Sequence, residues 1–77
     1  MSAHGWDPER RTFYRQLGRR LLAARERRAL SQTLLGARTG ISQTTIANIE
    51  GGVSQVTLFN FLAIARELGV EPTELFP

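Results

Sequence analysis

The sequence predicts an all-α fold: a single domain of five helices over residues 9–77, behind a flexible N-terminal lead of residues 1–8. Apolar residues recur three and four positions apart in several segments, as they do on the inner face of a helix. No segment alternates apolar and polar residues for long, so strands are not expected. Hydrophobic residues make up 42% of the 77 residues and charged residues 22%, which is typical of a globular domain.

The first predicted helix spans residues 9–28. Asp7 and Pro8 form a helix-start signal, because Asp caps a helix and Pro suits its first turn. Arg25 lies at the edge of the apolar stripe of this helix. The stripe itself consists of Phe13, Leu17, Leu21 and Ala24, and the opposite face carries Arg11, Arg15, Arg19 and Glu26.

Two shorter helices are predicted over residues 32–38 and 43–50, with Ser31 and Ser42 as their N-caps. Gly40 allows a tight turn between them, because glycine adopts a positive φ easily. Gly36 is expected where the two helices cross, since only a small residue lets the backbones approach. The side chains expected to share a core with Leu21 are Leu35, Ile46 and Ile49.

The C-terminal half predicts a helix over residues 58–68, capped by Thr57 and ended by Gly69, and a fifth short helix from Glu71 and Pro72. Phe59 is expected to face outward. The expected inward-facing residues of the fourth helix are Leu58, Phe61, Leu62, Ala65 and Leu68.

The ten basic residues are all arginines, and they are unevenly distributed. Residues 1–38 hold nine arginines and three acidic residues, a net charge of +6, whereas residues 39–77 hold one arginine and four acidic residues, a net charge of −3. Arginine suits phosphate, because its planar guanidinium donates two parallel hydrogen bonds. A GC-rich genome explains the same preference for arginine over lysine, so charge alone does not identify a partner.

The chain offers little for catalysis or metal binding. It has no cysteine, which excludes disulfides and thiolate sites, and its single histidine, His4, has no partner for a catalytic triad. We therefore expect no enzyme activity, no cofactor and no metal. The longest apolar run, residues 61–65, is far below the ~20 residues of a membrane span, and no secretory signal opens the chain. A cytoplasmic protein with no membrane partner is expected.

Residues 30–50 carry the most informative pattern. Two short helices joined by a three-residue turn containing glycine are typical of a helix-turn-helix. A helix in the DNA major groove needs small polar side chains near its N-terminus; Gln and Asn can each bond adenine twice, and Thr offers a methyl to thymine. A merely solvated face is the alternative. The outward residues concerned are Gln43, Thr44, Thr45, Ala47 and Asn48.

The order and spacing of several motifs resemble the phage repressor and Cro-like helix-turn-helix transcription regulators, of the xenobiotic-response-element type. The motifs are LGRRL followed by Arg25, LSQ at 30–32, GIS at 40–42, Ile46, IEGG at 49–52 and LAIARELGVEPTELF at 62–76. The resemblance implies a five-helix lambda-repressor-like DNA-binding domain. It also implies a homodimeric regulator, such as a repressor, that binds a palindromic operator in double-stranded DNA with residues 43–50 as recognition helix.

Within that family, the chain looks most like the controller proteins of restriction–modification systems, which also act as small regulators. The features concerned are Val56, Leu58, Asn60 and the C-terminal EPTELF segment.

The resemblance further implies roles for individual residues. Gln43, Thr44 and Asn48 are implied to contact bases. Gln32 is implied to bond a phosphate and to steady Gln43. Other candidate phosphate contacts are Ser31, Ser42, Thr45 and Arg38, and the pair implied to clamp the first helix to the end of the recognition helix is Arg25 and Glu50.

The chain departs from the family in the loop at residues 51–55, where many relatives carry basic residues and this chain reads GGVSQ. Cations for phosphate must therefore come from elsewhere. The candidates are Arg38, Arg10, Arg11 and the outward arginines of the first helix, although such a row is also consistent with a solvated face.

The C-terminal half holds more large apolar residues than a thin core needs, which favours a homodimer interface. Packing under the final helix is the alternative. No small-molecule effector is expected. A protein-binding module of the same fold, either an antitoxin-like partner or an anti-regulator, is the alternative function, and the uncharged loop favours it. The predicted interface residues are Val56, Phe59, Phe61, Leu62 and Phe76.

Overall fold

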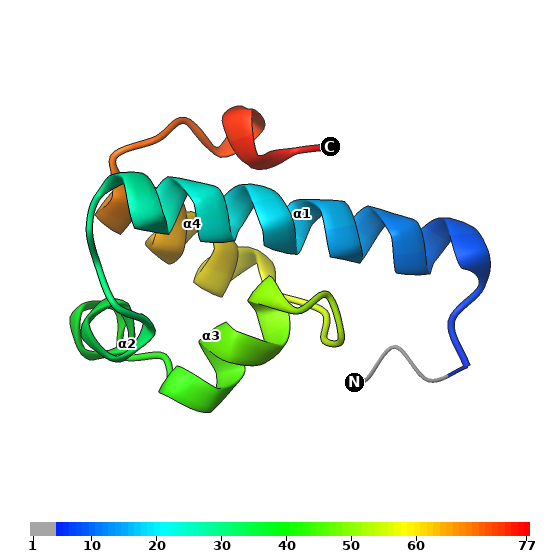
Figure 1. Cartoon of the computed structure of the whole chain (residues 1–77), viewed down its shortest axis with the longest axis horizontal. Coiled ribbons are helices and arrows are strands. Elements are labelled where there is room, and N and C mark those ends of the chain that lie inside the picture. Colours follow the sequence, from blue (N-terminus) through cyan, green and yellow to red (C-terminus); the bar gives the residue numbers. More distant parts are fainter. Residues whose placement is uncertain (1–4) are drawn as a thin grey trace.

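The computed structural model describes residues 5–77, which form four α-helices and one 3-10 turn, with no strand among them. The all-α prediction is confirmed over these residues. Figure 1 shows α1 spanning the length of the molecule, with α2 and α3 below it and α4 behind it. The elements are α1 (Pro8–Arg27), α2 (Gln32–Thr39), α3 (Gln43–Glu50), α4 (Leu58–Leu68) and η1 (Pro72–Leu75).

The predicted short fifth helix is present only as the 3-10 turn η1, so the count of five helices is not confirmed. Its bonds connect residues three apart, from Glu74 N to Glu71 O at 2.9 Å and from Phe76 N to Thr73 O at 3.3 Å. The Glu74 carboxylate accepts from Glu71 N at 2.8 Å, and Phe76 has an extended backbone. A capping box formed by Glu71 and Glu74 therefore stabilises the start of the turn, and the extended backbone of Phe76 ends it.

The helix starts follow the predicted caps. The Asp7 carboxylate accepts from Arg10 N at 2.8 Å, and the Ser31 and Ser42 hydroxyls accept from backbone N–H groups three residues on, at 3.0 and 3.1 Å. Thr57 caps α4 in the same way at 3.1 Å. These side chains satisfy N–H groups that have no partner within their own helices.

The core draws on every element. Side chains with essentially no exposure come from α1 to α4 and from η1, and they are Leu21, Leu35, Ile46, Ile64, Leu68 and Leu75. Gly36 lies where α2 meets α3, because a Cβ there would stand 2.6 Å from the Ile41 carbonyl oxygen. Gly18 serves the same purpose between α1 and α3, where its Cβ would stand 2.6 Å from the Glu50 oxygen. The sequence predicted the first approach and missed the second.

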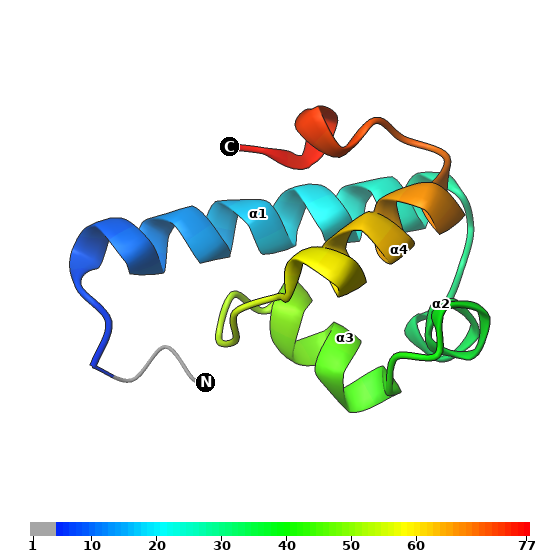
Figure 2. The same cartoon turned by 180° about the vertical axis from the view of Figure 1, so that it is seen from behind.

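The predicted inward face of α4 is wrong in part. Leu58 is 71% exposed and Leu62 45% exposed, whereas Ile64, which the prediction omitted, is fully buried. The buried positions follow the spacing i, i+3, i+4 and i+7, and Leu58 and Leu62 lie on the neighbouring stripe. Figure 2 views this helix from its outer side. The buried residues are Phe61, Ile64, Ala65 and Leu68.

The flexible lead predicted for residues 1–8 is described from Gly5 onward, and His4 lies outside the described residues. Trp6 is 7% exposed, and its ring lies 4.9 Å from that of Tyr14 on α1. The Arg11 guanidinium donates to the Trp6 carbonyl at 3.2 Å. This part of the lead therefore packs against α1.

Candidate nucleic-acid interface

The helix-turn-helix consists of α2, a turn around Gly40 and α3. Gly40 has a φ of +77° and its N–H donates to the Gly36 carbonyl, which lets α2 end and the chain reverse within three residues. On α3, Ile46, Ile49 and Glu50 point inward. The predicted base-reading residues lie on the outer surface: Gln43, Thr44 and Asn48 are exposed, and Thr45 and Ala47 are half-buried.

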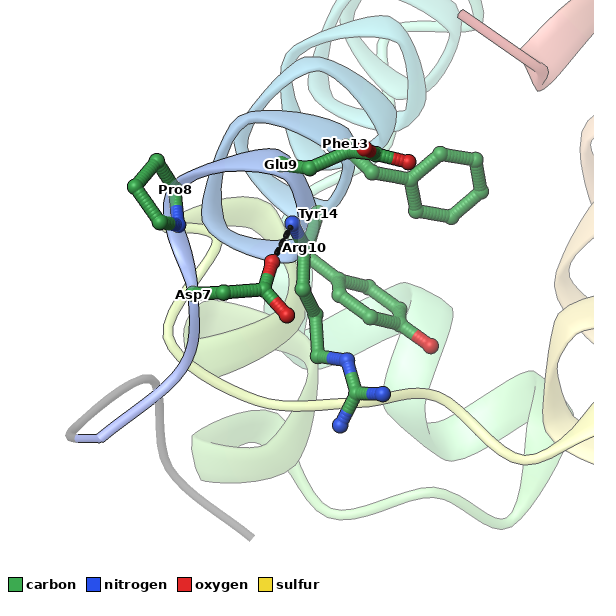
Figure 3. A pocket seen from close by; sticks show the side chains of 6 residues that line it. All are labelled: Asp7, Pro8, Glu9, Arg10, Phe13 and Tyr14. Carbon is green, nitrogen blue, oxygen red and sulfur yellow. Dashed lines mark hydrogen bonds between the residues drawn. The ribbon is translucent and has the colours of Figure 1, made fainter.

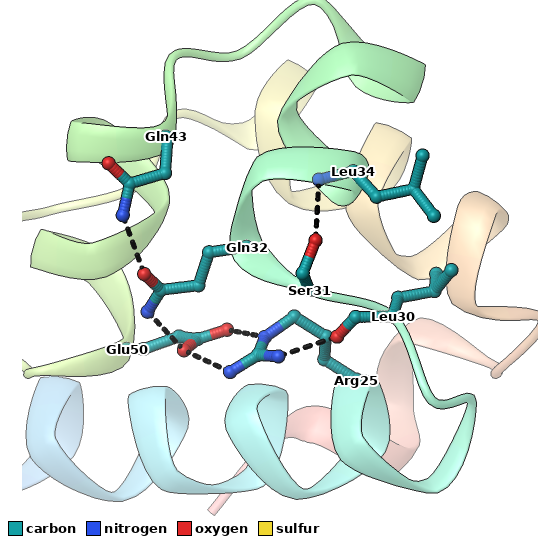
Figure 4. A network of polar contacts seen from close by, with 7 residues as sticks. All are labelled: Arg25, Leu30, Ser31, Gln32, Leu34, Gln43 and Glu50. Atoms are coloured by element: carbon teal, nitrogen blue, oxygen red, sulfur yellow. Dashed lines mark hydrogen bonds and ion pairs between the residues drawn. The ribbon is translucent and has the colours of Figure 1, made fainter.

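A buried ion pair joins α1 to the end of α3 (Figure 4). Arg25 Nε donates to Glu50 Oε2 at 2.6 Å and Nη2 donates to Oε1 at 3.0 Å, while Nη1 donates to the Leu30 carbonyl at 2.6 Å. The Arg25 and Glu50 side chains are only 11% and 4% exposed. The hydrogen bond to Glu50 raises the pKa of Arg25. The pair implied by the resemblance is thus formed, in the two-pronged geometry that Arg and carboxylate prefer.

Gln32 connects this ion pair to the first residue of α3. Its Nε2 donates to Glu50 Oε1 at 2.9 Å, and its Oε1 accepts from Gln43 Nε2 at 2.7 Å. A carboxylate only accepts hydrogen bonds, so Glu50 fixes which end of the Gln32 amide faces it. The carbonyl end of Gln32 then faces Gln43, which directs the Gln43 NH₂ group inward and leaves its carbonyl oxygen pointing away from the network (Figure 4).

The other predicted phosphate contacts are engaged within the protein. The Ser31 and Ser42 hydroxyls cap their helices, and the Ser42 hydroxyl donates to Thr45 Oγ1 at 2.8 Å. Arg38 forms an exposed ion pair with Glu67 of α4, with Nη1 and Oε1 3.3 Å apart. Exposed pairs of this kind contribute ~1 kcal/mol or less, so Arg38 is held only weakly.

The uncharged loop after α3 packs closely on α1. Gly52 has a φ of +74°, and a Cβ on it would stand 2.6 Å from Arg15 Cα. The sequence did not predict this contact, although two consecutive glycines are a general signal of close backbone approach. Close packing against α1 therefore fixes the position of the loop, which lies next to Arg15.

The predicted dimer residues divide into exposed and buried ones. Phe59 is 80% exposed and Phe76 47% exposed, whereas Phe61 is only 3% exposed and stacks on Phe76 with ring centroids 5.5 Å apart. Phe61 is thus a core residue, because it lies on the buried stripe of α4. Leu62 is exposed and Val56 is half-buried. The prediction missed an apolar hollow beside these residues, lined by Phe13, Tyr14, Leu17, Val56, Leu58, Phe61 and Phe76.

A second hollow lies at the start of α1 (Figure 3). Its Asp7 carboxylate is engaged as the helix cap through Arg10 N. Within residues 5–77, no three His, Cys, Asp or Glu side chains gather as a metal site would require. Over the same residues, no helix combines the length and apolar character needed to cross a membrane. The lining residues are Asp7, Pro8, Glu9, Arg10, Phe13 and Tyr14.

Residues 21–75, most of the chain, match the family model described as helix-turn-helix (HTH_3). The chain belongs to this family. A curated relative, an uncharacterized HTH-type transcriptional regulator from Sinorhizobium fredii, is 39% identical over 61 residues, which is 74% of this chain and 31% of the relative. The chain thus spans about a third of that relative's length.

Among solved structures, the restriction-modification controller protein C.AhdI from Aeromonas hydrophila is 35% identical, with a TM-score of 0.79, over 82% of this chain and 96% of that protein. The DNA-binding domain of BldD is 26% identical, with a TM-score of 0.77, over 86% of this chain and 96% of that domain. The same fold also forms part of an enzyme, hydroxypropylphosphonic acid epoxidase from S. wedmorenis, of which the similarity covers 36%. This family is one of transcription regulators, and the fold serves as one part of that larger enzyme.

Proposed function

We propose that the protein is a sequence-specific regulator of transcription, in the cytoplasm, that binds a palindromic operator as a homodimer and places α3 in the major groove. The observation that carries the proposal is the exposed Gln43 amide, which the buried Arg25–Glu50 pair orients through Gln32. Base recognition through two hydrogen bonds needs an amide of fixed orientation, because each adenine edge presents a donor and an acceptor in fixed order.

The exposed residues of α3 supply the base contacts in this proposal. Gln43 keeps its carbonyl oxygen and one N–H free for a base edge, Asn48 can form a second two-bond contact, and Thr44 can offer its methyl to thymine. The N-termini of α2 and α3 point N–H groups outward, where they favour phosphate. The side chains proposed to contact phosphates are Gln32, Ser31, Ser42, Thr45 and Arg38. Gln32 can donate to a phosphate only through the Nε2 hydrogen that its bond to Glu50 leaves free, since its Oε1 accepts from Gln43.

The exposed apolar side chains of α4 and η1 supply the dimer interface in this proposal. Phe59 and Leu58 are 80% and 71% exposed, which is unusual for adjacent large apolar side chains on a small domain. A two-fold axis along this surface would set two recognition helices ~34 Å apart, one turn of DNA. The interface residues are Val56, Leu58, Phe59, Leu62 and Phe76.

The similarity to C.AhdI extends over 96% of that controller's length at 35% identity. We therefore propose that the regulated genes belong to a restriction–modification system. A reporter that carries a promoter of restriction–modification genes from the same genome tests this: its output is expected to change when the protein is produced, and an unchanged output contradicts it.

Selection from a pool of random duplexes, followed by mobility shift at low salt, tests DNA recognition. The selected site is expected to be a palindrome with half-sites one helical turn apart, and Asn48→Ala is expected to lose discrimination at one base pair of each half-site. Leu34→Ala, at an exposed α2 position outside the proposed contacts, is the matched control. No enrichment of any duplex, together with a stoichiometric protein partner in a pull-down, would instead identify a protein-binding module.

A further inference from the structure

One side of α1 carries arginines that neither of the ion pairs above uses. Arg11, Arg15 and Arg19 stand four residues apart and are all exposed. Within residues 5–77 the ion pairs are Arg25–Glu50 and Arg38–Glu67, so this row has no acidic partner there. Like charges at this spacing on a helix repel one another. An anion lying along the row would relieve that repulsion.

The row borders α3 and its loop. A Cβ on Gly52 would stand 2.6 Å from Arg15 Cα, and a Cβ on Gly18, one turn further along α1, would stand 2.6 Å from the Glu50 carbonyl oxygen. The side of α1 that carries Arg15 is therefore in contact with the last turn of α3 and the loop after it. In Figure 1 the N-terminal half of α1 continues beyond this loop.

Arg11 is already held in place without being neutralised. Its Nη2 donates to the Trp6 carbonyl at 3.2 Å, and Trp6 is buried against Tyr14. A carbonyl group carries no net charge, so the guanidinium keeps its full charge and further N–H donors. A side chain that is held in advance loses less conformational entropy when it binds.

The loop at residues 51–55 has no charged side chain, although a loop that follows a helix in the major groove comes to the phosphate backbone at the groove wall. Arg15 lies directly beside this loop. Residues 8–20 of α1, which carry Arg11 and Arg15, precede the segment 21–75 that the family model matches. This cationic surface is therefore additional to the part of the chain that the family defines.

We propose that Arg11 and Arg15 form a second phosphate-binding surface, which grips the DNA backbone beside each half-site and replaces the charge missing from the loop. The inference rests on the proposed function, because it requires α3 to lie in the major groove. Each phosphate neutralised by a cation adds ~0.9 to the slope of log affinity against log salt. Two copies of one arginine in a dimer therefore contribute ~1.8.

The test compares Arg15→Gln and Arg11→Gln with the control Arg20→Gln in the full chain. Arg20 is exposed on the same helix but lies about 140° around it from Arg15. Affinity for the selected operator duplex, with about ten extra base pairs on each side, is measured between 50 and 200 mM salt. Each of the first two variants is expected to lower the slope by ~1.8. Between 50 and 200 mM salt, the affinity of the wild type therefore falls about 12-fold more than the affinity of either variant. Arg20→Gln is expected to keep the wild-type slope.

A second arm removes the DNA instead of the side chains. A duplex that ends at the half-sites is expected to lower the wild-type slope, and to leave the slope of the Arg11→Gln/Arg15→Gln double variant unchanged. Arg15→Lys, which keeps the charge, is expected to keep most of the slope. Equal effects of Arg15→Gln and Arg20→Gln, or an unchanged slope in all variants, overturn the inference while specific binding stands. Failure of the wild-type chain to select any duplex overturns the proposed function itself.

Discussion

The surface around α2 and α3 differs from the surface of α4 and η1 in how far its side chains are satisfied by contacts within the chain. Around α3, polar side chains are paired within one chain: Arg25 with Glu50, Glu50 with Gln32, and Gln32 with Gln43. On α4, Phe59 and Leu58 are 80% and 71% exposed. The contrast teaches that the polar side chains around α3 are held by contacts within one chain, whereas the large apolar side chains of α4 stay exposed and would be covered only in the proposed dimer.

The largest effect is expected from breaking the polar surface at its buried end. Glu50→Ala leaves Arg25 without its carboxylate in a buried setting, which is expected to lower the free energy of unfolding by ~3–5 kcal/mol. Urea denaturation measures this. The double variant Arg25→Met/Glu50→Leu is the control, and it is expected to be much less destabilised, because it leaves no unpaired charge. A loss below 1 kcal/mol for Glu50→Ala would show that the pair does not support the network.

The apolar surface is expected to fail in a different way. Phe59→Glu is expected to weaken dimerisation at least ~30-fold, as loss of a central interface residue worth ~2 kcal/mol does, and to leave the monomer folded. Sedimentation equilibrium measures the dimerisation constant, and circular dichroism reports the fold. Leu34→Glu is the matched control, since Leu34 is 40% exposed on α2 and is not one of the proposed interface residues. If Phe59→Glu left dimerisation unchanged and Leu34→Glu abolished it, the interface would lie on α2 and not on α4.

A third change tests how tightly α1 holds the recognition helix. Gly18→Ala would bring a Cβ to 2.6 Å from the Glu50 carbonyl oxygen, so α1 and α3 must move apart. We expect a loss of ~1–3 kcal/mol on urea denaturation, the usual cost of overpacking. Helix propensity alone predicts a gain of ~1 kcal/mol for the same change, so the sign decides between the two effects. Thr12→Ala, at an exposed position of α1, supplies the propensity control.

The smallest expected effect lies in the turn between α1 and α2. Ala29 has a φ of +56°, in the left-handed region that residues with a Cβ occupy at a cost of ~1–2 kcal/mol. Ala29→Gly is expected to raise the unfolding free energy by up to ~1 kcal/mol, because part of the relief is offset by the greater freedom of glycine when unfolded. Thermal unfolding measures this, and a lower melting temperature would contradict it. Operator affinity is expected to stay unchanged, since the turn is outside the proposed contacts.

Local features of the sequence predicted the helix starts well. Asp7, Ser31, Ser42 and Thr57 all cap as expected, because a cap bonds to an N–H only three residues away. Gly36 was predictable for a similar reason, since it lies within a short helix-turn-helix of fixed geometry. The Arg25–Glu50 pair came from the family resemblance and not from local spacing, because its partners are 25 residues apart.

Other features depend on packing that the sequence does not display. α4 is apolar on more than one stripe, so the sequence alone does not decide whether Leu58 and Leu62 or Ile64 faces inward. Contact with α2 and η1 decides the rotation of the helix. The Gly18 and Gly52 contacts join segments more than 30 residues apart. Glu71 and Pro72 predicted the start of the last helical segment, whereas its end after one 3-10 turn follows from the extended backbone of Phe76.

In the proposed function, the buried ion pair orients the Gln43 amide through Gln32 for base recognition. The direct measurement is a double-mutant cycle with Gln32→Ala and Gln43→Ala. Affinities are measured for the selected operator and for the same duplex with the base pair nearest Gln43 replaced. We expect Gln32→Ala alone to remove most of the preference for the correct base pair, with a coupling of ~1 kcal/mol between the two side chains. If Gln32→Ala instead lowered the affinity for both duplexes equally and showed no coupling to Gln43, the proposed orientation of Gln43 would be contradicted.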